Sequence, residues 1–231
     1  MTRALDRSGR SPGAARLLAV TKGISADLAM EAVGLGVTDL GESRIQEAEP
    51  KIGIVGVGPR WHLVGHLQTN KAKRAVALFD EIHSIDSERL AQEVARRAAE
   101  LGRSPVVYVE VNTSGDAAKH GIPPEGAMEL TELVASLPPL LLVGFMTIGP
   151  LTGGAEGARQ AFRRLRGIRD DAAARGLLPA DGGLSMGMSD DFEIAIEEGA
   201  TIVRVGSALF GTGGTGGTGG PRGMDSGAAP E

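Results

Sequence analysis

The chain lacks cysteine and has few aromatic residues: one tryptophan, one tyrosine and five phenylalanines among 231 residues. The absence of cysteine excludes disulfides, thiolate metal sites and a cysteine nucleophile. No apolar run approaches the roughly 18 residues of a membrane span, and the N-terminal segment lacks an apolar stretch of signal-peptide length. A net charge of -5 argues against a general nucleic-acid or anionic-membrane surface. We therefore expect a soluble cytoplasmic protein with no nucleic-acid or membrane partner.

The two ends of the chain differ from its middle. Hydrophobic residues make up 42% of the sequence, which is enough for a substantial core. Residues 212–231 are mostly glycine, threonine and other small residues, so they cannot bury enough apolar surface to offset their ordering entropy. We predict a flexible tail there, a loosely ordered polar N-terminus over residues 1–15, and one folded domain over residues 16–211.

The domain alternates between short apolar runs and helical segments. Two helices are clear from apolar spacing and end signals: residues 87–102, with Asp86 or Ser87 as cap and Gly102 as stop, and residues 158–176. Eight runs are candidate strands: residues 17–21, 38–42, 61–65, 81–85, 106–111, 141–148, 183–186 and 201–206. Repeated strand–helix alternation predicts parallel strands joined by right-handed crossovers.

Eight such units favour an α/β fold consisting of a single (β/α)8 TIM barrel. The alternative is an open doubly wound sheet, although no G-x-G-x-x-G follows the first strand. The eighth helix is missing where the tail begins, and a short N-terminal helix is expected to cover the gap.

Polar residues at the carboxyl ends of barrel strands are the candidates for chemistry. Lys22 is the only one of the five lysines that directly follows an apolar strand run. A partly desolvated amine in the barrel mouth is a usable nucleophile toward carbonyl compounds. The alternative is a lysine that merely extends into solvent.

The last two strand ends predict an anion site. Ser189 precedes a short helical segment and is predicted to be its N-cap, beside free backbone N–H groups. Gly206 and Ser207 follow the eighth strand, where a Gly-Ser turn lets a ligand approach the backbone closely. Because barrel phosphate sites are often built from the loops after strands seven and eight, we expect a phosphate here.

Arg204 lies two residues before Gly206, so its side chain is expected to leave the strand toward the same mouth. A phosphate site, a strand-end lysine and a cation fit pyridoxal phosphate, which needs a phosphate cradle, an amine for a Schiff base and a partner for its pyridine nitrogen. The alternative for Arg204 is an ion pair inside the barrel.

Six ordered motifs resemble those of the pyridoxal phosphate homeostasis protein family: LLAVTK, GESRIQE, WHLVGHLQTNK, VNTSGDAAKHG, GFMTIG and SMGMSDDFEIAIEEGATIVRVGSALFG. The resemblance runs from about residue 17 to residue 211. It implies a barrel like the N-terminal domain of alanine racemase and a non-enzymatic role in binding and buffering the cofactor.

The resemblance also implies roles for individual residues. It implies a Schiff base at Lys22, a phosphate near Ser189, Gly206 and Ser207, and Arg204 facing the pyridine nitrogen. Two positions depart from the family motif: Ser43 stands where the motif has asparagine, and Ile24 where a second lysine is common. Ser43 is retained as a candidate cofactor-binding residue.

Several alternatives stay open. An amino-acid racemase-like enzyme on the same barrel would resemble the chain, but such enzymes add a second domain, and the only tyrosine, Tyr108, lies inside the fifth strand. A Schiff-base aldolase that uses Lys22 is a more distant alternative.

No metal site is expected, because His62 and His66 are interpreted as strand-end polar residues. We expect a monomer, with a dimer possible, whose partners are pyridoxal phosphate and apo-enzymes that receive it. Glu197 and Glu198 are expected to be solvated, and Trp61 and Phe145 to lie in the core.

Overall fold

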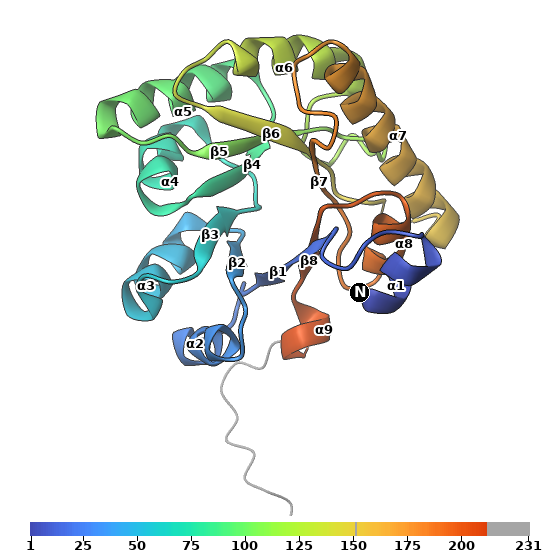
Figure 1. The fold of residues 1–231 in the computed structure, drawn as a ribbon. Helices are drawn as coiled ribbons and strands as arrows, with labels where there is room; N and C mark the ends of the chain where they lie inside the picture. Colours follow the sequence, from blue (N-terminus) through green and yellow to red (C-terminus); the bar gives the residue numbers. More distant parts are fainter. Residues whose placement is uncertain (151, 212–231) are drawn as a thin grey trace, which may run out of the picture.

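The computed structural model describes residues 1–150 and 152–211, so the predicted tail lies outside the described residues. Eight parallel strands close into a barrel in the order β1 to β8, with helices around the outside (Figure 1). The strands are β1 (Arg16–Val20), β2 (Asp39–Glu42), β3 (Arg60–Leu63), β4 (Glu81–Ile85), β5 (Val106–Glu110), β6 (Leu141–Met146), β7 (Gly183–Ser185) and β8 (Ile202–Val205). The predicted (β/α)8 barrel is confirmed, and the doubly wound alternative is wrong.

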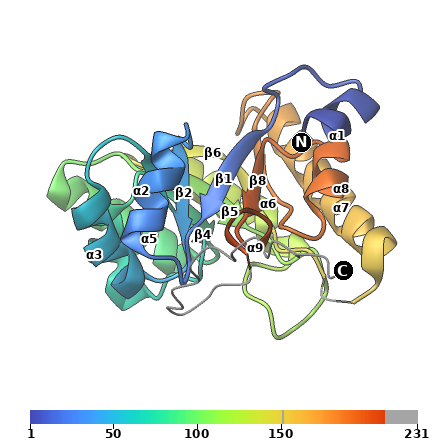
Figure 2. The ribbon, with the colours of Figure 1, turned by 90° about the horizontal axis from the view of Figure 1, so that it is seen from below.

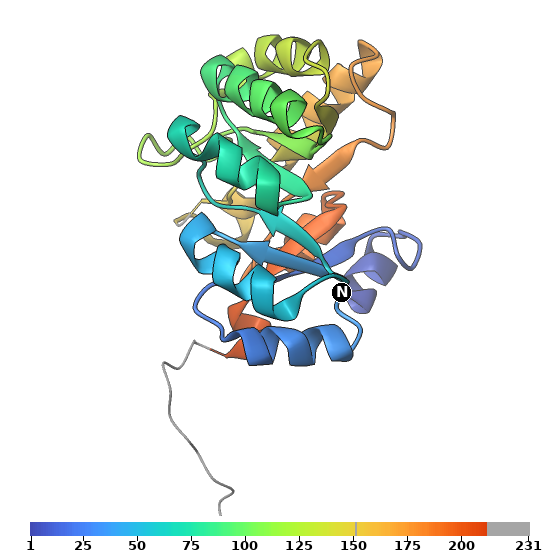
Figure 3. The ribbon, with the colours of Figure 1, turned by 90° about the vertical axis from the view of Figure 1, so that its left-hand side faces the viewer.

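The outer layer follows the chain order of the helices. Its members are α1 (Thr2–Arg7), α2 (Ala26–Gly34), α3 (Ile45–Val55), α4 (Ala72–Leu78), α5 (Glu88–Leu101), α6 (Ala127–Ala135), α7 (Gly154–Ala174), α8 (Phe192–Glu197) and α9 (Ser207–Phe210), with 3-10 turns η1 (Thr69–Lys71) and η2 (Pro124–Gly126). Helices α2 to α5 lie side by side along one flank, coloured from blue to green (Figure 3). Helix α5 begins after Ser87 and ends at Gly102, whose φ of 61° is the left-handed conformation that glycine adopts readily.

The N-terminus differs from the prediction. Residues 2–7 form α1, which packs on α8 and buries Ala4 and Leu5 (Figure 2). Arg10 donates two hydrogen bonds of 2.8 Å to carbonyl oxygens at and just beyond the end of α8. Two apolar side chains and one arginine therefore hold a segment whose overall polarity had suggested loose order. After β8 the described chain forms only α9, a four-residue helix that buries no residue, while α1 packs on α8 with Ala4 and Leu5 in the core, as expected of a short N-terminal helix that covers the gap.

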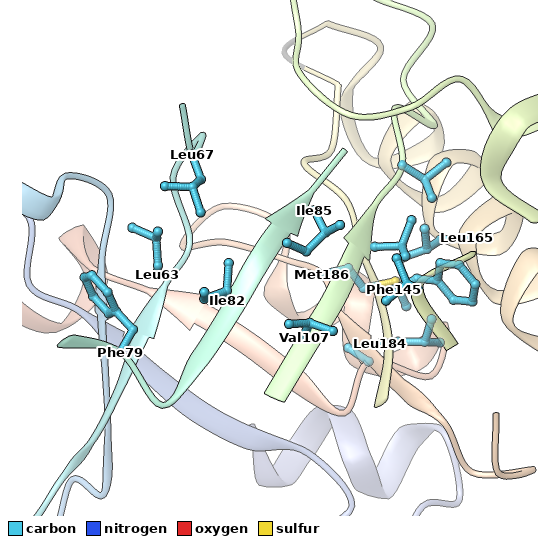
Figure 4. Packing of buried hydrophobic residues seen from close by; sticks show 14 of the residues in the cluster. Leu63, Leu67, Phe79, Ile82, Ile85, Val107, Phe145, Leu165, Leu184 and Met186 are labelled. Carbon is cyan, nitrogen blue, oxygen red and sulfur yellow. The ribbon is translucent and has the colours of Figure 1, made fainter. Parts of the chain in front are cut away.

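Apolar side chains pack in two regions. The larger fills the space between the strands and the helices, and includes Phe145, Leu165, Leu184 and Met186 on β6, α7 and β7 and the turn after β7 (Figure 4). The smaller is a set within the barrel: Leu18, Val64, Tyr108, Met146 and Ile202. Trp61 is 3% exposed and Phe145 is fully buried, as predicted.

Glu198 lies in an ion-pair cluster between α7 and α8. It is 3% exposed, and its carboxylate receives Arg159 at 2.6 Å and both Arg163 and Arg166 at 3.1 Å. Glu197 also pairs with Arg159, at 2.7 Å. The expectation of a solvated side chain is wrong for Glu198, because α7 presents a row of arginines to it, whereas the Glu197 side chain stays 22% exposed.

No described helix is both long and apolar enough to cross a membrane.

Candidate functional site

A cavity of about 490 Å³ lies at the carboxyl ends of the strands. All six residues predicted to bind a cofactor line it: Lys22, Ser43, Ser189, Arg204, Gly206 and Ser207. They come from the ends of β1, β2, β7 and β8. These ends lie close together because the barrel closes by pairing β1 with β8, which are far apart in the sequence. Apolar side chains complete the wall: Val20, Ile24, Val64, Ile148 and Met188.

Lys22 directly follows Thr21 at the end of β1, and its exposed side chain lines the cavity. The position is held from below by a buried ion pair, because Lys51 Nζ donates both to Thr21 O at 2.6 Å and to Glu42. Thr21 Oγ1 donates to the same carboxylate at 2.6 Å. The Lys51 ammonium is thus occupied by the buried ion pair and the Thr21 carbonyl. Lys22 is the lysine that lines the cavity and can reach a ligand.

Ser189 is not the N-cap that was predicted. Helix α8 begins three residues later, at Phe192, with Asp191 at its N-cap position, and Asp191 Oδ1 accepts a 2.6 Å hydrogen bond from Met188 N. Ser189 Oγ instead accepts from Ala208 N at 3.3 Å, which ties the loop after β7 to the start of α9. Serine and aspartate are both good caps, and the sequence offered three candidates in a row.

The two loops contribute backbone donors from residues that line the cavity. Within the described residues, the N–H groups of Ser189, Asp190 and Ser207 have no hydrogen-bond acceptor. These three residues line the cavity together with Gly206. A Cβ at Gly206 would lie 3.0 Å from Val20 O, so a side chain there would push the turn away from β1. Unpaired amides beside a glycine turn form a suitable binding site for an anion.

Arg204 reaches the cavity from inside the barrel. Its guanidinium donates to Ser185 O at 2.7 Å, to Ser185 Oγ at 2.9 Å and to Thr147 O at 2.8 Å. Burial lowers the pKa of Arg204 to about 10, so it remains a cation at neutral pH. No carboxylate forms an ion pair with it in the described part of the chain, so the alternative of an ion pair inside the barrel is wrong.

Glu110 is a buried carboxyl near this site that sequence reasoning missed. It is the last residue of β5 and is 3% exposed, and its Oε2 has no hydrogen-bond partner among the described residues. Burial, assisted by the charge of Asp86, raises its pKa to about 7.

Sequence reasoning also missed a polar network deeper in the barrel. His62 is fully buried and contacts Asp39 and His83, each from a different strand, so it is no strand-end residue. The ring of Tyr108, on β5, stacks on the imidazole of His83 with ring centroids 4.3 Å apart. Alternation within the run EIHSI could have revealed Glu81 and His83 as inward-facing residues.

The family model described as alanine racemase, N-terminal domain, matches residues 3–213. A protein of Aquifex aeolicus named pyridoxal phosphate homeostasis protein is 41% identical over 210 residues, covering 90% of this chain and 92% of that protein. The chain belongs to the pyridoxal phosphate homeostasis protein family. A human member of this family is 38% identical over 209 residues, covering 85% of this chain and 76% of its own length.

Solved structures agree with the fold. PipY of Synechococcus elongatus, solved with pyridoxal phosphate bound, superposes with a TM-score of 0.80 at 35% identity and covers 91% of this chain and 99% of its own. Alanine racemase of Clostridium difficile 630 superposes with a TM-score of 0.72 at 16% identity. It covers 90% of this chain but 54% of its own, so the likeness concerns the barrel fold alone.

Proposed function

We propose that the chain binds pyridoxal phosphate in the cavity at the carboxyl ends of the strands and serves to buffer and carry it, without catalysing a reaction of its own. The observation that most directly supports this is the convergence of Lys22, Arg204 and three unpaired backbone amides on one cavity. Its volume falls in the range of roughly 300–1,000 Å³ typical of small-molecule sites. The same ligand is bound by the related PipY.

The residues present fit the cofactor group by group. The amides of Ser189, Asp190 and Ser207 would hold the phosphate, supplemented by the Ser189 and Ser207 hydroxyls. The Lys22 amine would form the Schiff base with the aldehyde, and Arg204 would face the pyridine nitrogen. Ser43 offers a hydroxyl to the ring from the end of β2. When bound, the cofactor supplies an electrophilic ring that can stabilise a carbanion on an attached amino acid.

The chain's own residues favour holding the cofactor over using it. Arg204 stays cationic, so a pyridine nitrogen beside it remains unprotonated and the ring is a weaker electron sink. Tyr108 cannot act as a base in this cavity, because it lies within the barrel and lines a different pocket together with Arg16 at the amino-terminal ends of the strands. Burial also raises the pKa of Tyr108, which disfavours its loss of a proton.

Spectrophotometric titration tests the binding proposal. Wild-type protein should develop a visible absorption band on addition of pyridoxal phosphate, and Lys22→Ala should not. Lys73→Ala is the matched control, because Lys73 is an exposed lysine of α4. Equal bands in wild type and Lys22→Ala would contradict the role given to Lys22.

A turnover assay separates a carrier from the racemase-like alternative. Loaded protein is incubated with the common L- and D-amino acids while chirality, keto acid and amine are followed. The proposal requires background levels of all three. Multiple turnovers that disappear in Lys22→Ala would establish an enzyme instead.

We further propose that the protein is a cytoplasmic monomer that passes the cofactor to apo-enzymes.

A further inference from the structure

Three side chains inside the barrel bring one ligand atom each to a common point. His62 Nδ1 lies 3.1 Å from His83 Nε2 and 3.4 Å from Glu81 Oε2, and His83 Nε2 lies 3.6 Å from Glu81 Oε2. Their side chains are at most 6% exposed. The cluster lies on β3 and β4, and none of its three residues lines the cavity that Lys22 lines.

The spacing matches three corners of a metal coordination tetrahedron. With zinc–nitrogen and zinc–oxygen bonds of about 2.0–2.2 Å, two ligand atoms of a tetrahedral site lie about 3.3–3.6 Å apart. The three separations here differ from that range by about 0.2 Å at most. Two imidazoles and one carboxylate form a ligand set that zinc uses in proteins.

The far nitrogen of each ring has its own partner. His62 Nε2 lies 3.0 Å from Asp39 Oδ1, and because a carboxylate only accepts, this nitrogen carries a proton. A neutral His62 therefore turns the lone pair of Nδ1 toward the cluster. His83 Nδ1 lies 2.8 Å from Ser185 Oγ, and in the tautomer in which Nδ1 donates to this hydroxyl the lone pair of Nε2 faces the same point. Carboxylate and hydroxyl partners of this kind orient metal-binding histidines.

The third atom has no partner of its own. Glu81 Oε2 is buried and accepts no hydrogen bond from the described residues, while Oε1 lies 3.7 Å from Arg16 Nη2. In these tautomers two lone pairs and a carboxylate oxygen converge within 3.6 Å and repel one another unless a positive charge lies between them. A proton on His62 Nδ1 can bridge only one of these contacts at a time, whereas a metal ion satisfies all three.

We propose that His62, Glu81 and His83 supply three ligands to a divalent transition-metal ion of the zinc type, with the fourth position left to a water molecule. The ion would link β3 and β4 directly, and through Asp39 and Ser185 it would fix β2 and β7. Ser185 Oγ also accepts from Arg204, so the site would brace the arginine of the cofactor cavity. Because the ligands are buried, the ion would enter while the chain folds.

A second histidine cluster must be separated from this one in any experiment. His66 and His120 stack at the barrel mouth with ring centroids 3.8 Å apart, and His66 Nδ1 lies 3.3 Å from Asp86 Oδ2. These side chains are accessible and could capture metal adventitiously. The chain has four histidines in all, so replacing His66 and His120 leaves only His62 and His83.

The test measures metal in protein folded in cells supplied with zinc and then passed over a chelating resin. Elemental analysis should find about one zinc per chain both in wild type and in the His66→Ala/His120→Ala variant. X-ray absorption of that variant should show imidazole scattering, which only His62 and His83 can supply. Glu81→Gln should lower zinc affinity by at least about tenfold.

Less than about 0.1 zinc per chain in wild type would overturn the proposal. So would loss of the zinc in the His66→Ala/His120→Ala variant, or full retention in a folded Glu81→Gln protein. If Glu81→Gln fails to fold, the wild-type and surface-variant measurements still decide the question. None of them requires pyridoxal phosphate, so the result is independent of the proposed function.

Discussion

Arg204 on β8 and Ser185 on β7 are joined by two hydrogen bonds from one nitrogen: Arg204 Nη1 donates to the carbonyl oxygen of Ser185 at 2.7 Å and to its hydroxyl at 2.9 Å. The other terminal nitrogen donates to Thr147 O at the end of β6. One buried guanidinium therefore satisfies acceptors from two strands and is held rigidly while it lines the cavity. This geometry explains how a cation is positioned in a barrel without an ion pair.

Replacing Arg204 by lysine should destabilise the fold and weaken cofactor binding. A single ammonium cannot reach acceptors on two strands at once, so at least one buried carbonyl would lose its donor, at a cost of about 1–3 kcal/mol. Urea denaturation measures the loss. Arg96→Lys on the exposed face of α5 is the control and should change the free energy of unfolding by less than about 0.5 kcal/mol. Equal stabilities of the two variants would contradict the structural role of Arg204.

Pyridoxal without its phosphate should bind far more weakly than pyridoxal phosphate. The amides after β7 and β8 would lose their charged partner, and charge-assisted hydrogen bonds contribute roughly 1.5–3 kcal/mol each. Equilibrium dialysis with both compounds should give dissociation constants that differ by orders of magnitude. Similar constants would show that the amides do not hold the phosphate.

Gly206→Ala should weaken binding of pyridoxal phosphate by about tenfold. The added Cβ would meet Val20 O at 3.0 Å, so the turn that offers the Ser207 amide must move by a few tenths of an ångström. The φ of -122° at Gly206 lies outside the left-handed region that favours glycine, so we expect the effect to come mainly from the contact of the added Cβ. Gly167→Ala in α7 is the matched control, because nothing lies within 4 Å of its added Cβ. An unchanged affinity in Gly206→Ala would show that the turn does not contact the ligand.

Glu110 should make the stability of the cofactor-free protein fall as the pH rises. Its pKa is raised from 4.5 to about 7, chiefly by burial, so its contribution to stability is complete below pH 4.5 and is lost as the pH rises through about 7. Glu110→Gln keeps the neutral form at every pH. The free energy of unfolding of the variant relative to wild type should therefore grow by up to roughly 3 kcal/mol between pH 5 and pH 8. A difference that stays constant over this range would contradict the burial of an ionisable carboxyl at this position.

The strands could be predicted from the sequence because strands buried on both faces give short continuous apolar runs. All eight predicted runs overlap the observed strands, from the run at 17–21, which is β1, to the run at 201–206, which contains β8. Barrel closure then determines which strand ends meet, so the sequence alone predicts that the six candidate residues lie in one barrel mouth, where they line the cavity.

The predictions that were wrong depended either on a choice between neighbouring residues or on contacts between residues far apart in the sequence. The N-cap position of α8 falls at Asp191 and not at Ser189, because serine and aspartate are both favoured at this position and the sequence does not rank the neighbouring candidates. The pairing of Glu198 with α7 arginines depends on helix packing across more than thirty residues. The contacts of His62 with Asp39, Glu81 and His83 join three strands, so spacing within one strand can show that Glu81 and His83 face inward but not which side chains they meet.

Borohydride reduction followed by peptide mapping tests the central claim most directly. Pyridoxal phosphate is added to the purified protein, its covalent link is reduced, and the modified lysine is identified by mass spectrometry. We predict that the adduct lies on Lys22, the lysine that lines the cavity beside Arg204 and the free amides. An adduct on Lys71, Lys73 or Lys119 in its place would contradict the binding site proposed for this chain.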